Sequence, residues 1–69
     1  MILMSTAKLK KQILAELSEK PMSLNEIADK MELKPKRTFR LLRSLFNKDQ
    51  IKNIRDEDGT RRYALVEEN

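Results

Sequence analysis

The sequence predicts a small, mainly helical domain in which three helices are followed by a β-hairpin. Three observations support this fold class: a helix-capping motif that begins at Ser23, a strongly basic amphipathic pattern from Lys34 to Lys48, and an Asp58-Gly59 pair between two segments with strand character. A chain of 69 residues is long enough for one small domain with a thin core, so we expect a single domain over residues 1–69.

A first helix is predicted at about residues 5–19. Ser5 or Thr6 can cap its amino end, and the aliphatic residues that follow recur at the spacing of one helical face. This face is expected to pack into the core. Lys20-Pro21 then interrupts the helical pattern.

The second helix is predicted over residues 24–31 because its start is signalled twice. Ser23 and Glu26 match the capping box S-x-x-E, in which the two side chains satisfy each other's backbone N–H groups. Met22 and Ile27 occupy the two positions of a hydrophobic staple, which fixes the angle at which the chain enters the helix.

The third helix is predicted over residues 35–47, with Pro35 at its first position. At about 100° per residue, its apolar residues fan over one broad side with Leu42 near the centre. Phe39 and Phe46 lie at one edge of this side. We expect both in the core, with packing against the hairpin or exposure to solvent as the alternatives. Tyr63, farther along the chain, is also expected in the core, with its hydroxyl reaching the surface.

Charge is concentrated on this third helix. Residues 34–48 carry six Lys and Arg and no acid, whereas residues 1–33 are balanced and residues 49–69 have a net charge of −2. A helix with this imbalance repels itself unless an anion lies against it, so the pattern favours a polyphosphate partner. A solvated charged face is the alternative interpretation.

A β-hairpin is predicted over residues 51–66. Asp56–Gly59 forms the turn, in which Asp58-Gly59 is a strong hairpin signal. Because an isolated hairpin is only marginally stable, we expect it to pack on the helices through Ile51, Tyr63 and Leu65.

The composition argues against several functions. The chain has no Cys and no His, so the usual zinc ligands and the usual acid–base side chain are both missing. Its carboxylates, lysines and serines form no recognisable catalytic constellation. We therefore expect a protein that is not an enzyme and binds no cofactor and no metal. No apolar run has the length of a membrane span or a signal peptide, which favours an intracellular protein.

The order of these elements resembles the winged-helix (winged helix-turn-helix) DNA-binding domain of bacterial and archaeal transcription regulators. The resemblance rests on three segments: Ser23–Lys30 (SLNEIADK), Thr38–Ile51 (TFRLLRSLFNKDQI) and Asp58–Leu65 (DGTRRYAL). It implies a minimal first strand near Met22, a third helix that enters the major groove of double-stranded DNA, and a hairpin, the wing, on the backbone or the minor groove. The sequence departs from the family pattern at Asp49, where a Gly is common.

This resemblance implies DNA-contacting residues on both elements. The candidates on the third helix are Lys36, Arg37, Arg40, Arg43, Ser44, Asn47 and Lys48, and those on the wing are Lys52, Arg55, Arg61 and Arg62. Arg and Asn match the edges of guanine and adenine, while Arg43 and Lys48 are expected on phosphates. Arg61 and Arg62 alternate along a strand, so only one of them can face DNA. Pairing of these arginines with the acidic residues of the turn is the alternative.

The sequence therefore predicts a transcription regulator that binds double-stranded DNA and is cytoplasmic, in association with the nucleoid. Two alternatives use the same fold, namely a protein–protein interaction module and a non-specific chromatin- or RNA-associated protein. The basic segment favours DNA, because protein-binding surfaces tend to be depleted in Lys. The apolar residues Ile2, Leu3 and Met4, together with the exposed side of the first helix, suggest a homodimer. A monomer that pairs only on DNA is the other possibility.

Overall fold

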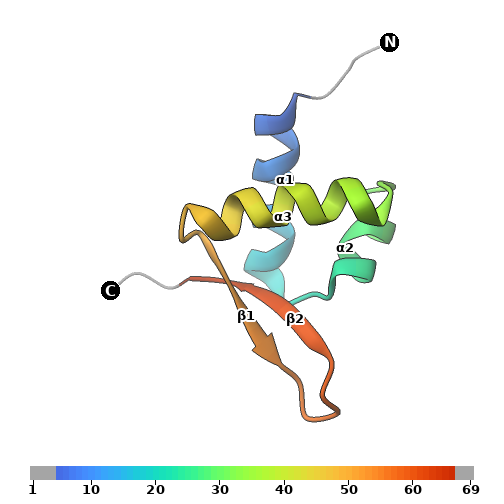
Figure 1. Ribbon diagram of the computed structural model, residues 1–69, viewed down its shortest axis with the longest axis vertical. Helices are drawn as coiled ribbons and strands as arrows, with labels where there is room; N and C mark the ends of the chain where they lie inside the picture. Colours follow the sequence, from blue (N-terminus) through green and yellow to red (C-terminus); the bar gives the residue numbers. More distant parts are fainter. Residues whose placement is uncertain (1–4, 67–69) are drawn as a thin grey trace.

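The computed structural model describes residues 5–66 as three helices that surround a small core, followed by a two-stranded antiparallel hairpin (Figure 1). The elements are α1 (Thr6–Glu19), α2 (Leu24–Lys30), α3 (Pro35–Asn47), β1 (Ile51–Arg55) and β2 (Arg61–Leu65). This arrangement confirms the predicted fold class. The apolar residues Ile2, Leu3 and Met4, where we expected a subunit contact, lie outside the described residues.

The helices begin where the sequence supplies a cap. The Ser5 hydroxyl accepts a hydrogen bond from the Lys8 N–H at 3.2 Å. At α2 the capping box is complete, because the Glu26 N–H donates to Ser23 Oγ at 3.2 Å and the Ser23 N–H donates to Glu26 Oε1 at 2.9 Å. No side chain caps α3, which begins at Pro35, a residue whose missing N–H costs nothing at that position.

The core draws on every element. Its buried apolar residues are Leu9, Ile13, Leu17, Met22, Ile27, Ala28, Leu41, Leu42, Leu45, Ile51 and Tyr63. Ile51 and Tyr63 come from the hairpin, so the wing is docked on the helices as its marginal intrinsic stability requires. None of the helices in the described part of the chain has the length and apolarity needed to cross a bilayer.

The prediction that Phe39 and Phe46 belong to the core was wrong. Their side chains are 49% and 44% exposed, whereas Thr38 is fully buried. Thr38 tolerates burial because its Oγ1 donates to the Lys34 carbonyl at 3.0 Å within the same helix. The buried face of α3 is therefore centred toward Thr38 and Leu45, and the two phenylalanines lie at its exposed edge.

The hairpin is also joined to the helices through the backbone. The Met22 N–H donates to the Tyr63 carbonyl at 3.0 Å, and the Tyr63 N–H donates to the Met22 carbonyl at 2.7 Å. This isolated bridge is the minimal first strand expected near Met22. It adds one residue pair beside β2, while the sheet itself keeps two strands.

Asp49 makes the turn between α3 and the hairpin. Its φ of 59° lies in the left-handed region, where Asp is one of the few tolerated residues besides Gly. Its N–H donates to the Phe46 carbonyl at 3.0 Å, and the next N–H, of Gln50, donates to the Leu45 carbonyl at 3.1 Å. Asp49 thus supplies the helix-ending conformation that Gly commonly supplies.

Candidate nucleic-acid interface

The side of α3 that faces away from the core carries a continuous row of polar residues. Lys36, Arg40, Arg43 and Asn47 follow one another at intervals of four, three and four residues, so they lie one above another on the helix. All four are exposed, and α3 contains no acidic residue. We call these four residues the basic stripe. At 1.5 Å per residue the stripe is about 16 Å long.

The remaining candidates on α3 lie beside the basic stripe, on the edge toward α1. Arg37 and Lys48 are exposed, and Lys48 is the residue that ends the helix. Ser44 is half-buried, and its hydroxyl accepts a hydrogen bond from Lys10 Nζ at 2.6 Å. Ser44 is therefore engaged with α1, a contact that the sequence did not reveal.

The opposite edge of α3 faces the hairpin across a cleft of about 310 Å³, which we call the wing-side cleft. The residues that line it are Phe39, Leu42, Arg43, Phe46 and Asn47 from α3, and Asn53, Arg61 and Tyr63 from the hairpin. None of these residues is acidic, and the two exposed phenylalanines border the cleft.

The structure divides the wing candidates between the two faces of the hairpin. Arg55 is directly opposite Arg61, and Asn53 is directly opposite Tyr63, so these residues share the face that lines the wing-side cleft. Arg55 and Arg61 are both exposed, and like charges directly opposite each other are destabilising unless an anion lies near them.

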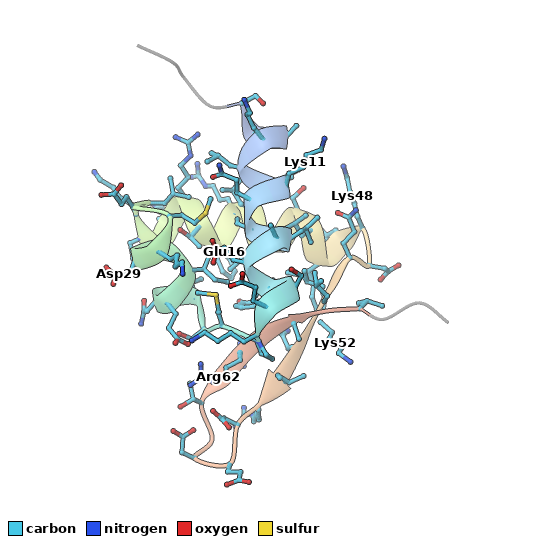
Figure 2. All side chains as sticks on the ribbon, turned by 180° about the vertical axis from the view of Figure 1, so that it is seen from behind. Lys11, Glu16, Asp29, Lys48, Lys52 and Arg62 are labelled. Carbon is cyan, nitrogen blue, oxygen red and sulfur yellow. The ribbon has the colours of Figure 1, made fainter. Side chains whose placement is uncertain are left out.

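The other face of the hairpin carries the two remaining wing candidates. Arg62 is half-buried beside Ile54, while the exposed Lys52 is directly opposite Ala64; both cations are labelled in the view from behind (Figure 2). These two side chains are therefore not gathered with Arg55, Arg61 and the basic stripe.

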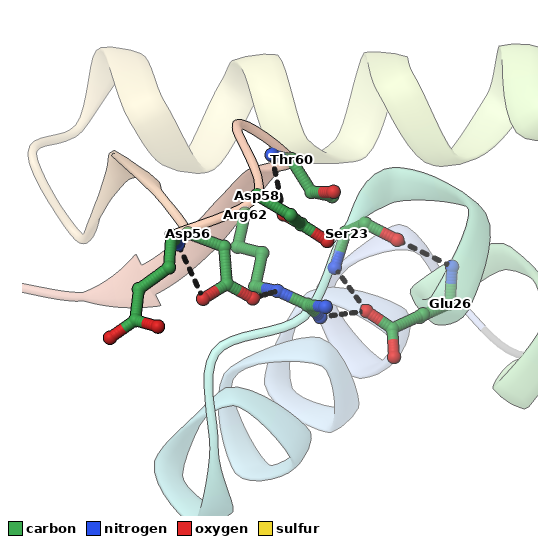
Figure 3. Close-up of polar contacts among 7 residues, drawn as sticks. Ser23, Glu26, Asp56, Asp58, Thr60 and Arg62 are labelled. Carbon is green, nitrogen blue, oxygen red and sulfur yellow. Dashed lines mark hydrogen bonds and ion pairs between the residues drawn. The ribbon is translucent and has the colours of Figure 1, made fainter.

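Arg62 is held between the wing and α2 (Figure 3). Its Nε donates to Asp56 Oδ2 at 2.8 Å, and its Nη1 pairs with Glu26 Oε1. The hydrogen bond to Asp56, with the charge of Glu26, raises the pKa of Arg62. The pKa of Glu26 is lowered chiefly by the backbone N–H of Ser23, with smaller contributions from the Ser23 hydroxyl and from Arg62. Both partners stay charged at neutral pH, so this contact persists.

The turn of the wing is shaped by its own acids. Asp58 accepts a hydrogen bond from the Thr60 N–H at 2.9 Å, and this bond is the main reason that the pKa of Asp58 is lowered. Asp56 accepts from the Glu57 N–H at 2.9 Å as well as from Arg62. Within residues 5–66, no group of three acidic side chains is placed to hold a metal ion.

Comparison with solved structures identifies the fold. The sequence matches no protein-family model and no curated protein. Two variants of Lactococcus lactis ZitR superpose with TM-scores of 0.82 and 0.81, at 26% and 24% identity, and cover 96% and 86% of this chain. Wild-type ZitR superposes with a TM-score of 0.78 at 23% identity over 96% of this chain. The fold is a winged helix.

The winged helix spans less than half of ZitR, since the matches cover 44%, 42% and 43% of the three ZitR chains. ZitR is a winged-helix transcription regulator, and this chain has the same fold. In this winged helix α2 and α3 form the helix-turn-helix, and β1 with β2 forms the wing. Most of the residues that the sequence singled out lie on the exposed side of α3 and on the wing face that borders it.

Proposed function

We propose that this chain is a double-stranded DNA-binding transcription regulator without catalytic activity, in which α3 enters the major groove and the wing lies on the backbone or in the adjacent minor groove. The observation that supports it is the basic stripe, an exposed and acid-free row that is about as long as a few base-pair steps. In this proposal residues 1–69 form one domain, and a protein of this kind acts in the cytoplasm at the nucleoid.

Within the basic stripe the roles follow from side-chain geometry. Arg40 lies near the middle of the helix, where a guanidinium can pair bidentately with guanine, and Asn47 carries the amide that matches adenine. Arg43 borders the wing-side cleft, a position suited to a backbone phosphate. Lys48, at the end of α3, and Arg37, at its α1 edge, are further phosphate contacts.

Two substitutions test this assignment. Arg40→Ala should weaken binding to a selected site by about 1–3 kcal/mol and relax the preference at one base pair. Lys48→Ala should weaken binding to all sequences alike. The measurement is fluorescence anisotropy on selected and random duplexes of equal length. Equal losses on both duplexes for both variants would show that α3 reads no bases, and the protein would then be a non-specific binder.

A second candidate function is a protein–protein interaction module, which the exposed Phe39 and Phe46 favour. Aromatic residues are enriched in the cores of such interfaces. The double variant Phe39→Ser with Phe46→Ser tests it, since neither side chain is buried. Unchanged DNA affinity together with loss of a protein partner would support the protein–protein interaction module. Loss of DNA affinity would instead show that the edge of α3 with the two phenylalanines contacts DNA.

The regulator is also proposed to be a homodimer that uses Ile2, Leu3, Met4 and the exposed side of α1. Two copies would cover a palindromic site with half-sites about 34–36 Å apart. Small DNA-binding domains usually reach specific affinity through such pairing. Sedimentation equilibrium of the full chain and of a chain that starts at Met4 tests this. A monomer in both cases would end the dimer proposal, and a dimer unaffected by the truncation would move the interface elsewhere.

A further inference from the structure

A groove of about 590 Å³ runs between the amino-terminal half of α1 and residues 34–44, which include most of α3, and we call it the α1–α3 groove. It is lined by five cations and by no acid. The cations are Lys10, Lys34, Lys36, Arg37 and Arg40. The ion pairs found among residues 5–66 involve none of the five. Lys10 and Lys34 were not among the DNA-contacting residues expected from the sequence.

The basic and acidic residues of α1 are separated along the helix, with its lysines in the half that lines the groove. Residues 5–15 contain three lysines and no acid, and the two acids of the helix, Glu16 and Glu19, lie in its other half. Neither α1 nor α3 has an acidic residue in its first turn, so the partial positive charges of both helix ends add to those of the side chains. An anion in the groove would offset this repulsion.

Lys10 is anchored at the edge of α3. Its Nζ donates to Ser44 Oγ at 2.6 Å in a partly buried contact. An ammonium group has three donors, so two remain for a ligand while the first holds the side chain in place. The bond thus pre-positions one cation on α1 beside the basic stripe, which reduces the entropy lost when an anion binds.

We propose that the α1–α3 groove binds phosphates of the DNA backbone on the strand opposite the one met by the wing. The proposal rests on the function proposed above and adds α1 to the DNA-contacting surface. Figure 1 shows the amino-terminal half of α1 on one side of α3 and the hairpin on the other. When α3 lies in the major groove, its two edges face the two phosphate backbones that border that groove.

The lining of the groove favours a backbone phosphate over a small effector. Small-molecule pockets are lined mainly by apolar side chains with a few polar groups, whereas five of the eight residues here are cations. Two of them, Lys36 and Arg40, also belong to the basic stripe, so the groove continues into the surface expected to meet the bases. One extended polyanion can therefore occupy both.

The test measures how the affinity for a random duplex depends on salt. Lys10→Gln with Lys34→Gln should make the negative slope of log K against log salt shallower by about 1.8, because each phosphate contact contributes about 0.9, and should weaken binding at least about tenfold at about 0.1 M salt. Lys11→Gln with Lys20→Gln is the matched control. Both are exposed lysines outside the groove, and Lys11 is visible from behind in Figure 2.

Each outcome has one meaning. A salt slope that becomes shallower for the groove variant and not for the control supports the proposal, and Lys10→Arg with Lys34→Arg should restore the wild-type slope. A groove variant that stays folded and keeps the wild-type slope overturns the proposal while leaving the proposed function intact. A wild-type protein that binds no duplex overturns the proposed function itself. Circular dichroism confirms the helical content of every variant.

Discussion

Arg61 and Arg62 are neighbours in the sequence, yet the structure gives them opposite surroundings, and this difference can be measured. Arg61 is exposed on the hairpin face that lines the wing-side cleft, whereas Arg62 is held by Asp56 and Glu26. We expect Arg61→Ala to remove one phosphate contact. The negative slope of log K against log salt should then become shallower by about 0.9, and the affinity at about 0.1 M salt should fall by up to about eightfold.

Arg62→Ala should leave that slope unchanged, because its guanidinium is already neutralised by two carboxylates. It should instead lower the thermal midpoint, since the contact between the wing and α2 is lost. Lys52→Ala is the control, as it removes one exposed wing charge from the hairpin face opposite Arg61.

The assay is fluorescence anisotropy on one labelled duplex across a series of salt concentrations. Equal slope changes for Arg61→Ala and Arg62→Ala would refute the reasoning, because the ion pairs would then have no influence on DNA contact. An equal change for Lys52→Ala would show that only the net charge matters.

Three further predictions follow from the geometry. The hydrogen bonds that lower the pKa of Glu26 below 4.5 stabilise the fold when the pH is above 4.5, and this stabilisation is lost as the pH falls through the folded-state pKa. Wild type and Glu26→Gln should therefore differ in thermal midpoint at neutral pH, and this difference should disappear at acidic pH. Thr38→Val should change the free energy of unfolding, measured in urea, by less than about 1 kcal/mol, because the Lys34 carbonyl keeps its bond from the Thr38 N–H and the added methyl is buried. Thr38→Ala leaves a void and should cost about 1–2 kcal/mol. We expect the exposed Phe39 to contact a thymine methyl, so replacing thymine by uracil in a selected site should weaken wild-type binding, whereas Phe39→Ala should bind both duplexes equally.

Signals that act over a few residues were read correctly from the sequence. The capping box at Ser23 and Glu26 depends only on spacing within one turn, and it forms as expected. Pro35 begins α3, and the Asp58-Gly59 pair lies in the turn of the hairpin, with Gly59 at a φ of 88°. In each case the physical cause lies within the segment itself.

The burial of α3 could not be read in the same way. Periodicity locates the apolar side of a helix from the directions of all its apolar residues. Phe39 and Phe46 extended the predicted apolar side toward one edge of α3. The neighbouring elements decide which part of the side is covered, and they cover Thr38. A threonine can be buried there because it bonds to its own helix, which hydrophobicity alone does not indicate.

The candidate site shows the same limit over longer distances. Alternation along the strand predicted that only one of Arg61 and Arg62 could face DNA. Which of the two is instead held in an ion pair with α2 depends on Glu26, which is distant in the sequence. Lys10 is similar, because its position beside Ser44 follows from how α1 crosses α3. The sequence did show that the first half of α1 has no acids. This pattern predicts that Lys10 contacts an anion only when it is known that α1 lies beside the basic helix α3.

The backbone bridge between Met22 and Tyr63 has a consequence for the order in which the chain can fold. It joins a residue that precedes α2 to one in the last strand, so α2, α3 and β1 all lie between its two ends. A contact of this kind must close a long loop before it yields any stabilisation, which slows folding. Once formed, it couples the two ends of that loop. The amide hydrogens of Met22 and Tyr63 are therefore expected to exchange with solvent only when the whole molecule opens, and the wing is not expected to open by itself at its base.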